Sequence, residues 1–125
     1  MCRPKEIVSV RLTNKDRRYL NLARNVAMSS SERMKHGAVI VKGGRVLSVG
    51  INKFRNHPDI IESDLVKTSC SVHAEVDALR KIKNARGATI YVARVNKRGF
   101  ERLSRPCDYC YEAIEDAGIS KIIYT

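Results

Sequence analysis

The 125-residue sequence predicts one α/β domain in which helices cover a mixed β-sheet. Two observations predict this class. Apolar segments in the first half form a β-hairpin around a Gly-Gly pair, and helix-like and strand-like segments then alternate to residue 125. A chain of this length buries roughly two-thirds of its unfolded surface, which is enough for one hydrophobic core.

The chain is expected to begin with a basic arm and a helix. Residues 1–12 form the arm, whose apolar residues make a short strand or pack over the core. A helix is predicted from Asn14, with Thr13 or Asn14 as its cap and Asp16 in its first turn, because side-chain oxygens and negative charge favour helix starts. The buried stripe of this helix consists of Tyr19, Leu22, Ala23, Val26 and Ala27.

The hairpin is predicted to pair residues 38–41 with residues 46–51. Gly43 and Gly44 supply the positive backbone angles that a tight turn requires. Residues 53–72 then form a long connection, with a short helix expected over 59–67. Loops of this length are often lids or binding loops.

Helices and strands alternate in the second half. The first helix covers residues 73–83, with Val76, Leu79 and Ile82 on one side. Residues 88–95 are rich in β-branched side chains, predict a central strand and lead into a basic loop over 96–105. The last elements are a helix over 107–117, which ends before a C-cap glycine at 118, and a strand over 121–124.

One histidine and two cysteines form a candidate zinc site. His73, Cys107 and Cys110 offer an imidazole and two thiols, the ligands that suit zinc best. Three protein ligands leave a fourth tetrahedral position open to water, as in catalytic zinc sites. The two cysteines share a face at a helix start, where the helix dipole favours thiolates. Glu75 lies two residues from the histidine, so it is placed to carry protons beside the metal.

The segments HAE at 73–75 and PCDYC at 106–110 resemble the H-x-E and P-C-x-x-C signature of the cytidine and deoxycytidylate deaminase superfamily. The resemblance implies that His73, Cys107 and Cys110 hold one zinc ion per chain and that Glu75 is the catalytic proton carrier. It also implies that the backbone of Ala74 contacts the substrate base.

The same resemblance implies a three-layer α-β-α fold of the cytidine deaminase type, with a mixed central sheet of strand order 2-1-3-4. Residues 13–125 would form a single zinc-dependent deaminase domain after the basic arm. Gly50-Ile51-Asn52 is similar to the G-x-N that ends the second strand in many members, so Asn52 is a predicted substrate contact. The expected reaction is hydrolytic deamination of a cytosine-containing nucleotide or nucleoside, of the dCMP or cytidine type, to the uracil product and ammonia.

The charge distribution points to an anionic partner or to a solvated basic surface. Residues 1–56 carry 13 Lys or Arg and 3 Asp or Glu, so they hold most of the formal net charge of +11. A polynucleotide substrate, single-stranded DNA or tRNA with cytosine or adenine as the target base, is therefore the alternative within the enzyme class. For a 5′-phosphate, Lys53, Arg55 and Arg105 are the candidate ligands, and Phe54 is a candidate for stacking on a base.

A non-catalytic protein is the main rival hypothesis. Cys70 stands three residues before His73, so it is placed to complete a closed, four-ligand structural zinc site in a nucleic-acid-binding module. Such a site gives no reason for Glu75. The spacing of Cys2, His36 and His57 is too scattered to indicate a second zinc site.

The expected partners are the substrate and further copies of the chain, with no membrane. An open last edge of the sheet favours a homo-oligomer, because proteins usually cover such edges. Four cysteines, two of them in a metal-type C-x-x-C, favour a reducing compartment, and the first ten residues lack the apolar core of a secretory signal. A cytoplasmic location is expected.

Overall fold

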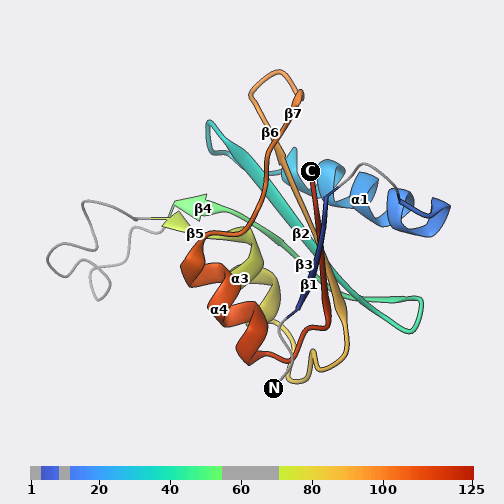
Figure 1. Cartoon of the computed structure of the whole chain (residues 1–125). Coiled ribbons are helices and arrows are strands. Elements are labelled where there is room, and N and C mark those ends of the chain that lie inside the picture. Colours follow the sequence, from blue (N-terminus) through green and yellow to red (C-terminus); the bar gives the residue numbers. More distant parts are fainter. Residues whose placement is uncertain (1–3, 9–11, 55–70) are drawn as a thin grey trace, which may run out of the picture.

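The computed structural model describes residues 4–8, 12–54 and 71–125. A mixed sheet forms the middle layer, and the helices lie on its two faces (Figure 1). From one edge to the other the strands are β1 (Lys5–Val8), β8 (Lys121–Tyr124), β6 (Thr89–Val95), β2 (Lys35–Lys42) and β3 (Arg45–Ile51). A short strand, β7 (Glu101–Arg102), pairs with the end of β6. The predicted α/β class and three-layer arrangement are confirmed.

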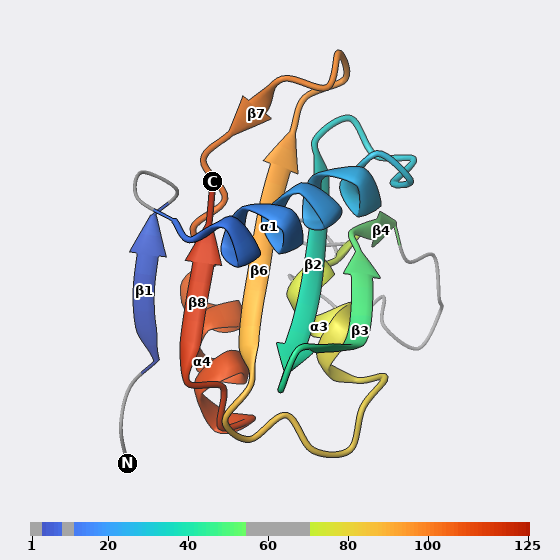
Figure 2. The same cartoon turned by 90° about the vertical axis from the view of Figure 1, so that its right-hand side faces the viewer.

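The two faces of the sheet carry different helices. Helix α1 (Asn14–Ala27) crosses one face, and α3 (Ala74–Leu79) and α4 (Asp108–Asp116) lie on the other (Figure 2). Each face has its own apolar cluster. The cluster under α1 includes Leu20, Ala23, Val39, Val41, Tyr91 and Ile123. The cluster under α3 and α4 includes Ala38, Ile40, Ala74, Ala78, Ile90, Val92, Ile114 and Ile122.

The strand order differs in detail from the expected 2-1-3-4. That order is present as β3-β2-β6-β8, but the sheet continues through β1, which pairs in parallel with β8. Residues 5–8 of the expected basic arm therefore cover the edge that was predicted to be open or closed by self-association. Association between copies of the chain stays a prediction.

The predicted N-terminal helix is confirmed together with its cap. Thr13 has extended backbone angles, and its hydroxyl accepts a hydrogen bond from the Asp16 amide at 3.1 Å. The hairpin is also confirmed, with longer strands than predicted, and Gly43 and Gly44 have φ angles of 59° and 76° at its turn.

Two glycines allow the helices to lie directly on the sheet. A Cβ atom at Gly37 would be 2.2 Å from the Ala23 carbonyl oxygen of α1, and one at Gly50 would be 2.3 Å from the Ala74 carbonyl oxygen of α3. The two strands that carry them are neighbours, and each glycine admits one helix backbone on its own face.

The second half contains several differences from the prediction. Helix α3 ends at Leu79 rather than at residue 83, because the amides of residues 81 and 82 bond to carbonyls only three residues back and tighten the chain into turns. Its buried apolar residues are Ala74 and Ala78, whereas Val76 is half-buried. The close approach at Gly50 leaves room only for small side chains there.

Three short strands were not predicted. Besides β7, strands β4 (Lys53–Phe54) and β5 (Ser71–Val72) pair with each other and join the two ends of the long connection. The predicted helix over residues 59–67 lies outside the described residues. In the described part of the chain, no helix is long and apolar enough to cross a membrane.

Candidate metal centre

Two helix N-termini on one face of the sheet present the predicted metal ligands. His73 is the N-cap of α3 and Cys107 is the N-cap of α4, and both have extended backbone angles. Neither side chain makes a capping hydrogen bond, in contrast to Thr13 on α1. Both side chains are therefore available to a ligand between the helices.

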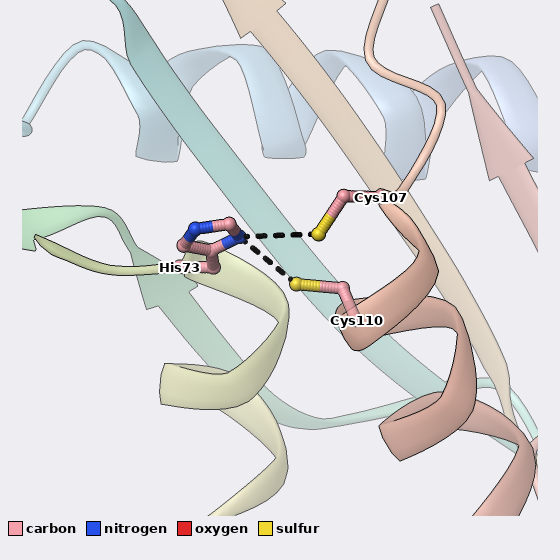
Figure 3. Close-up of side chains that lie close together, drawn as sticks. All are labelled: His73, Cys107 and Cys110. Carbon is pink, nitrogen blue, oxygen red and sulfur yellow. Dashed lines mark hydrogen bonds between the residues drawn. The ribbon is translucent and has the colours of Figure 1, made fainter. Parts of the chain in front are cut away.

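The three predicted ligands converge. The Nδ1 atom of His73 lies 3.0 Å from the Cys110 sulfur and 3.7 Å from the Cys107 sulfur (Figure 3). The three ligand atoms lie within 4.8 Å of one another. Typical Zn–N and Zn–S bonds in a tetrahedral site separate nitrogen from sulfur by about 3.6 Å. The donor set and its spacing therefore fit one zinc ion, held by an imidazole and two thiolates.

The surroundings of Cys110 disfavour its thiolate form unless a cation lies nearby. Burial raises the pKa of the Cys110 thiol above its usual range, and negative charge on Glu75 and Cys107 raises it further. A metal ion among these groups compensates for the negative charges that the site otherwise disfavours.

Glu75 lies on the first turn of α3 and is 6% exposed. Burial raises the pKa of its carboxyl group to about 7, and hydrogen bonds from its own backbone and from Cys110 act in the opposite direction. The link to Cys110 places this carboxyl group beside the metal ligands. A carboxyl group with this pKa both donates and accepts protons near neutral pH.

A buried carboxylate anchors α3 to the edge strand β3. Asp77 is fully buried, and its Oδ2 atom accepts a hydrogen bond from the Ile51 amide at 3.1 Å. Lys53, Arg80 and Lys81 each place a side-chain nitrogen within 3.3 Å of this carboxylate. Burial opposes ionisation of Asp77, but the hydrogen bonds from Ile51 and the lysines prevail and lower its pKa. Sequence analysis missed Asp77. The available signal was the spacing of Arg80 and Lys81, three and four residues after Asp77 at the end of α3.

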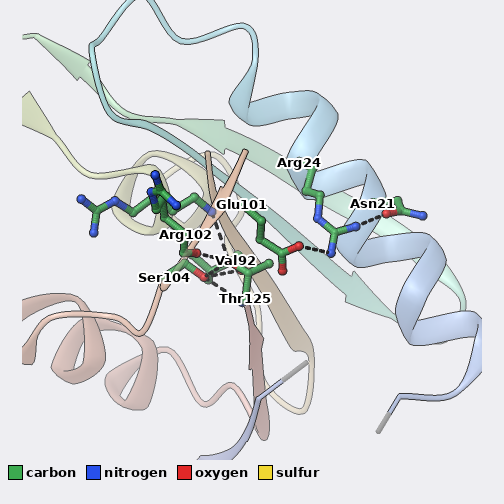
Figure 4. Close-up of polar contacts among 8 residues, drawn as sticks. Asn21, Arg24, Val92, Glu101, Arg102, Ser104 and Thr125 are labelled. Carbon is green, nitrogen blue, oxygen red and sulfur yellow. Dashed lines mark hydrogen bonds and ion pairs between the residues drawn. The ribbon is translucent and has the colours of Figure 1, made fainter. Parts of the chain in front are cut away.

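A second polar network fixes the loop that leads to the cysteines. The Ser104 hydroxyl donates to the Val92 carbonyl oxygen at 2.7 Å and accepts from the Thr125 amide at 2.9 Å (Figure 4). The Thr125 hydroxyl donates to the Arg102 carbonyl oxygen at 2.6 Å. Arg105 is held by Glu6 of β1 at 3.0 Å. Glu6 of β1, Val92 of β6 and Thr125, the residue after β8, thus position the chain just before Cys107.

The two predicted substrate residues, Asn52 and Ala74, are both buried in the structure. Asn52 is buried, its Oδ1 atom accepts the His36 amide at 2.8 Å, and its Nδ2 atom donates to the Met34 carbonyl oxygen at 2.7 Å. Ala74 is buried behind His73 in the first turn of α3. Their contacts with a substrate stay predictions.

The candidate phosphate ligands are used in other ways or lie outside the described residues. Lys53 is paired with Asp77, and Arg105 is paired with Glu6. Arg55 lies outside the described residues, and so does Cys70, the proposed fourth ligand of a structural site. The side chain of Phe54 is likewise not described.

His36 lies close to the metal centre, although its spacing in the sequence gave no sign of this. It is on β2, and its backbone is fixed by Asn52. Burial lowers its pKa to about 4, and the positive charges of Arg94 and His73 lower it further. His36 is therefore a neutral imidazole at neutral pH, in a cationic environment.

Comparisons with known proteins agree with this geometry. Residues 13–125 match the family model described as the cytidine and deoxycytidylate deaminase zinc-binding region. Among solved structures, the chain is similar to the dCMP deaminase of cyanophage S-TIM5 in its apo form, with 25% sequence identity and a TM-score of 0.66. The match covers 90% of this chain and 84% of the phage enzyme, which has also been solved in complex with dCMP and dUMP.

Two other solved structures show the same fold. RibD of Acinetobacter baumannii, form 1, has 26% identity and a TM-score of 0.56, and the match covers 89% of this chain and 28% of RibD. The cytidine deaminase of Mycobacterium tuberculosis has 24% identity and a TM-score of 0.54, with 83% of this chain and 79% of that chain covered. Among curated proteins, no sequence relative is found.

Proposed function

Because the chain belongs to the cytidine and deoxycytidylate deaminase family, we propose that it converts a cytosine-containing nucleotide or nucleoside to the uracil product and ammonia. Membership of this family identifies the chain as a zinc-dependent hydrolytic deaminase that acts on a C–N bond. The identity of the substrate is what we propose here. The reaction type is supported mainly by the juxtaposition of three zinc ligands with the buried carboxyl group of Glu75, and the cytosine substrate is supported by the family match and the similarity to the phage dCMP deaminase.

The side chains divide the chemistry between them. Bound zinc supplies a Lewis acid that activates a water molecule for attack on C4 of the base. His73, Cys107 and Cys110 hold the metal. Glu75 would accept one proton from the attacking water and donate it to the ring nitrogen N3. It would then accept the second proton from the new C4 hydroxyl and donate it to the leaving amino group. A C4–O bond forms, the C4–N bond breaks, and ammonia leaves.

Two residues are proposed to orient the base and sugar. The backbone of Ala74 would contact the base, because it directly follows the ligand His73. Asn52 already uses one amide hydrogen and one lone pair within the protein. An amide has a second hydrogen and a second lone pair, so Asn52 retains the capacity to bind a substrate hydroxyl.

Ammonia release from four substrates tests the proposal. The zinc-loaded protein is incubated with dCMP, deoxycytidine, single-stranded DNA and tRNA, and ammonia is measured. Turnover of dCMP or deoxycytidine is expected. Glu75→Gln is expected to keep its zinc but to lose at least about 10²-fold in rate, the usual scale for a general acid or base. Undiminished turnover by this variant would refute the role of Glu75.

A polynucleotide is the second candidate substrate, favoured by the excess positive charge of residues 1–56. Its affinity would fall steeply with ionic strength, because each phosphate contact releases condensed counterions. Deamination of a mononucleotide would respond only mildly to salt. Activity on single-stranded DNA or tRNA alone, with a steep salt dependence, would replace the first candidate by the second.

A further inference from the structure

Three basic side chains form a row across three adjacent strands beside the metal centre. His36 on β2 lies opposite Arg94 on β6, and Arg94 lies opposite Arg102 on β7. Directly opposed residues share one face of a sheet. We refer to His36, Arg94 and Arg102 as the basic row.

The basic row lies on the face that carries the metal ligands. Side chains two residues apart on a strand share a face. Ala38 and Val92, two residues from His36 and Arg94, are buried in the same apolar cluster as Ala74, which follows the ligand His73.

Charges on β7 are sorted between the two faces. Glu101 pairs at 2.8 Å with Arg24 of α1, on the face away from the metal centre, whereas Arg102 extends to the other side of the strand (Figure 4). Like charges opposite each other destabilise a sheet, and Arg94 faces Arg102 with no acidic residue between them. Among the described residues, the ion pairs are formed by other arginines and by lysines. Neither Arg94 nor Arg102 has an acidic partner there.

Arg94 also carries an unused donor. Its Nη1 atom donates to the Leu103 carbonyl oxygen at 3.4 Å, but its buried Nε atom has no hydrogen-bond partner among the described residues. A buried donor without a partner is destabilising, and a ligand or water molecule is its usual partner. Arg94 therefore has a donor that an anion bound at the row can use.

We propose that the basic row binds the phosphate group of the substrate, so that the enzyme acts on cytosine nucleotides in preference to the free nucleoside. This inference rests on the proposed function. In a nucleotide the phosphate is separated from the base by the sugar, so it needs a site apart from the metal ligands, and the row lies on the same face of the sheet as these ligands. Two guanidinium groups supply the charge and the forked donors that phosphate binding uses, and the His36 imidazole adds an N–H. The phosphate is either that of a mononucleotide or a phosphodiester of a single strand.

Product binding tests the row independently of turnover. Affinities for dUMP and deoxyuridine are measured by calorimetry on the zinc-loaded protein and on Arg102→Ala, Arg94→Gln and Arg18→Ala. Arg102 is exposed, so its variant is expected to fold. Arg18 is an exposed residue of α1, and its replacement removes the same charge from the opposite face.

The row predicts that dUMP binds at least about 10-fold more tightly than deoxyuridine, and that each row variant weakens dUMP binding by about 10-fold or more, the scale of a charge-assisted hydrogen bond. Deoxyuridine binding should stay unchanged, and Arg18→Ala should change neither. Equal affinities for dUMP and deoxyuridine, or equal losses for both ligands in the row variants, would overturn the inference.

Two further measurements separate the possible outcomes. If dCMP is not deaminated but the preference for dUMP over deoxyuridine disappears in the row variants, the phosphate-binding role of the row is supported and the proposed reaction fails. A single-stranded oligonucleotide without terminal phosphates distinguishes the sources of the phosphate. If its affinity falls in Arg102→Ala and the salt slope decreases by about one, the row holds a phosphodiester. If its affinity is unaffected while dUMP binding falls, the row holds a mononucleotide phosphate.

Discussion

Gly50 offers a test of how the fold positions the metal ligands. A Cβ atom at this position would lie 2.3 Å from the Ala74 carbonyl oxygen and 2.5 Å from the Ala78 amide nitrogen, whereas ordinary contacts begin near 3.4 Å. Helix α3 must therefore move away by about 1 Å in Gly50→Ala. Because His73 is the N-cap of α3, it would move relative to the cysteines on α4.

Gly37→Ala is the matched control. Its Cβ atom would lie 2.2 Å from the Ala23 carbonyl oxygen and 2.5 Å from the Ala27 amide nitrogen, so the overlap is of the same size but is directed at α1. Overpacking of this kind costs about 1–3 kcal/mol, which lowers Tm by roughly 4–12 °C for a chain of this size. Both variants should lose stability by a similar amount.

Only Gly50→Ala should impair the metal centre. A displacement of about 1 Å costs on the order of 10²-fold in activity, and zinc affinity should fall as well. Thermal unfolding, competition for zinc with a chromophoric chelator, and ammonia release measure the three quantities. Equal zinc loss in Gly37→Ala and Gly50→Ala, or normal zinc affinity in Gly50→Ala, would refute this account of how the centre is built.

Two further predictions concern the polar anchors. Asp77→Asn should lower the free energy of unfolding by about 1–3 kcal/mol at neutral pH. The pKa of Asp77 is lowered in the folded state, so the stability difference between Asp77→Asn and the wild type should shrink as the pH falls through that pKa. Denaturant titrations at neutral and acid pH measure this difference, and a difference that does not change with pH would contradict the prediction. Ser104→Ala removes three hydrogen bonds near Cys107 and should speed zinc release. The control Ser120→Ala, which loses two hydroxyl bonds elsewhere in the sheet, should not, and equal release rates would argue against the loop's role.

The sequence was most informative where local chemistry decides the structure. The cap at Thr13, the glycine turn at 43–44 and the strand at 88–95 followed from propensity and periodicity, and all three are present. The metal ligands followed from residue type and spacing, because few side-chain combinations suit zinc. For His73 to converge with the cysteines it had to lie at a helix N-terminus, and it is the N-cap of α3.

Features that depend on distant residues were not predictable in this way. The pairing of β1 with β8 joins segments more than 100 residues apart, and a short apolar stretch does not encode its partner. The early end of α3 depends on turns whose amides bond to carbonyls three residues back, and the helical spacing of apolar residues did not reveal them. The basic row depends on the register of three strands, because His36, Arg94 and Arg102 are scattered in the sequence and meet only in the sheet.

X-ray absorption at the zinc edge tests most directly whether the metal keeps a position for chemistry. The account predicts one zinc per chain with two sulfur scatterers at about 2.3 Å and lighter nitrogen or oxygen scatterers in the remaining positions. A third sulfur scatterer, lost in Cys70→Ser, would show a closed structural site and contradict the catalytic assignment.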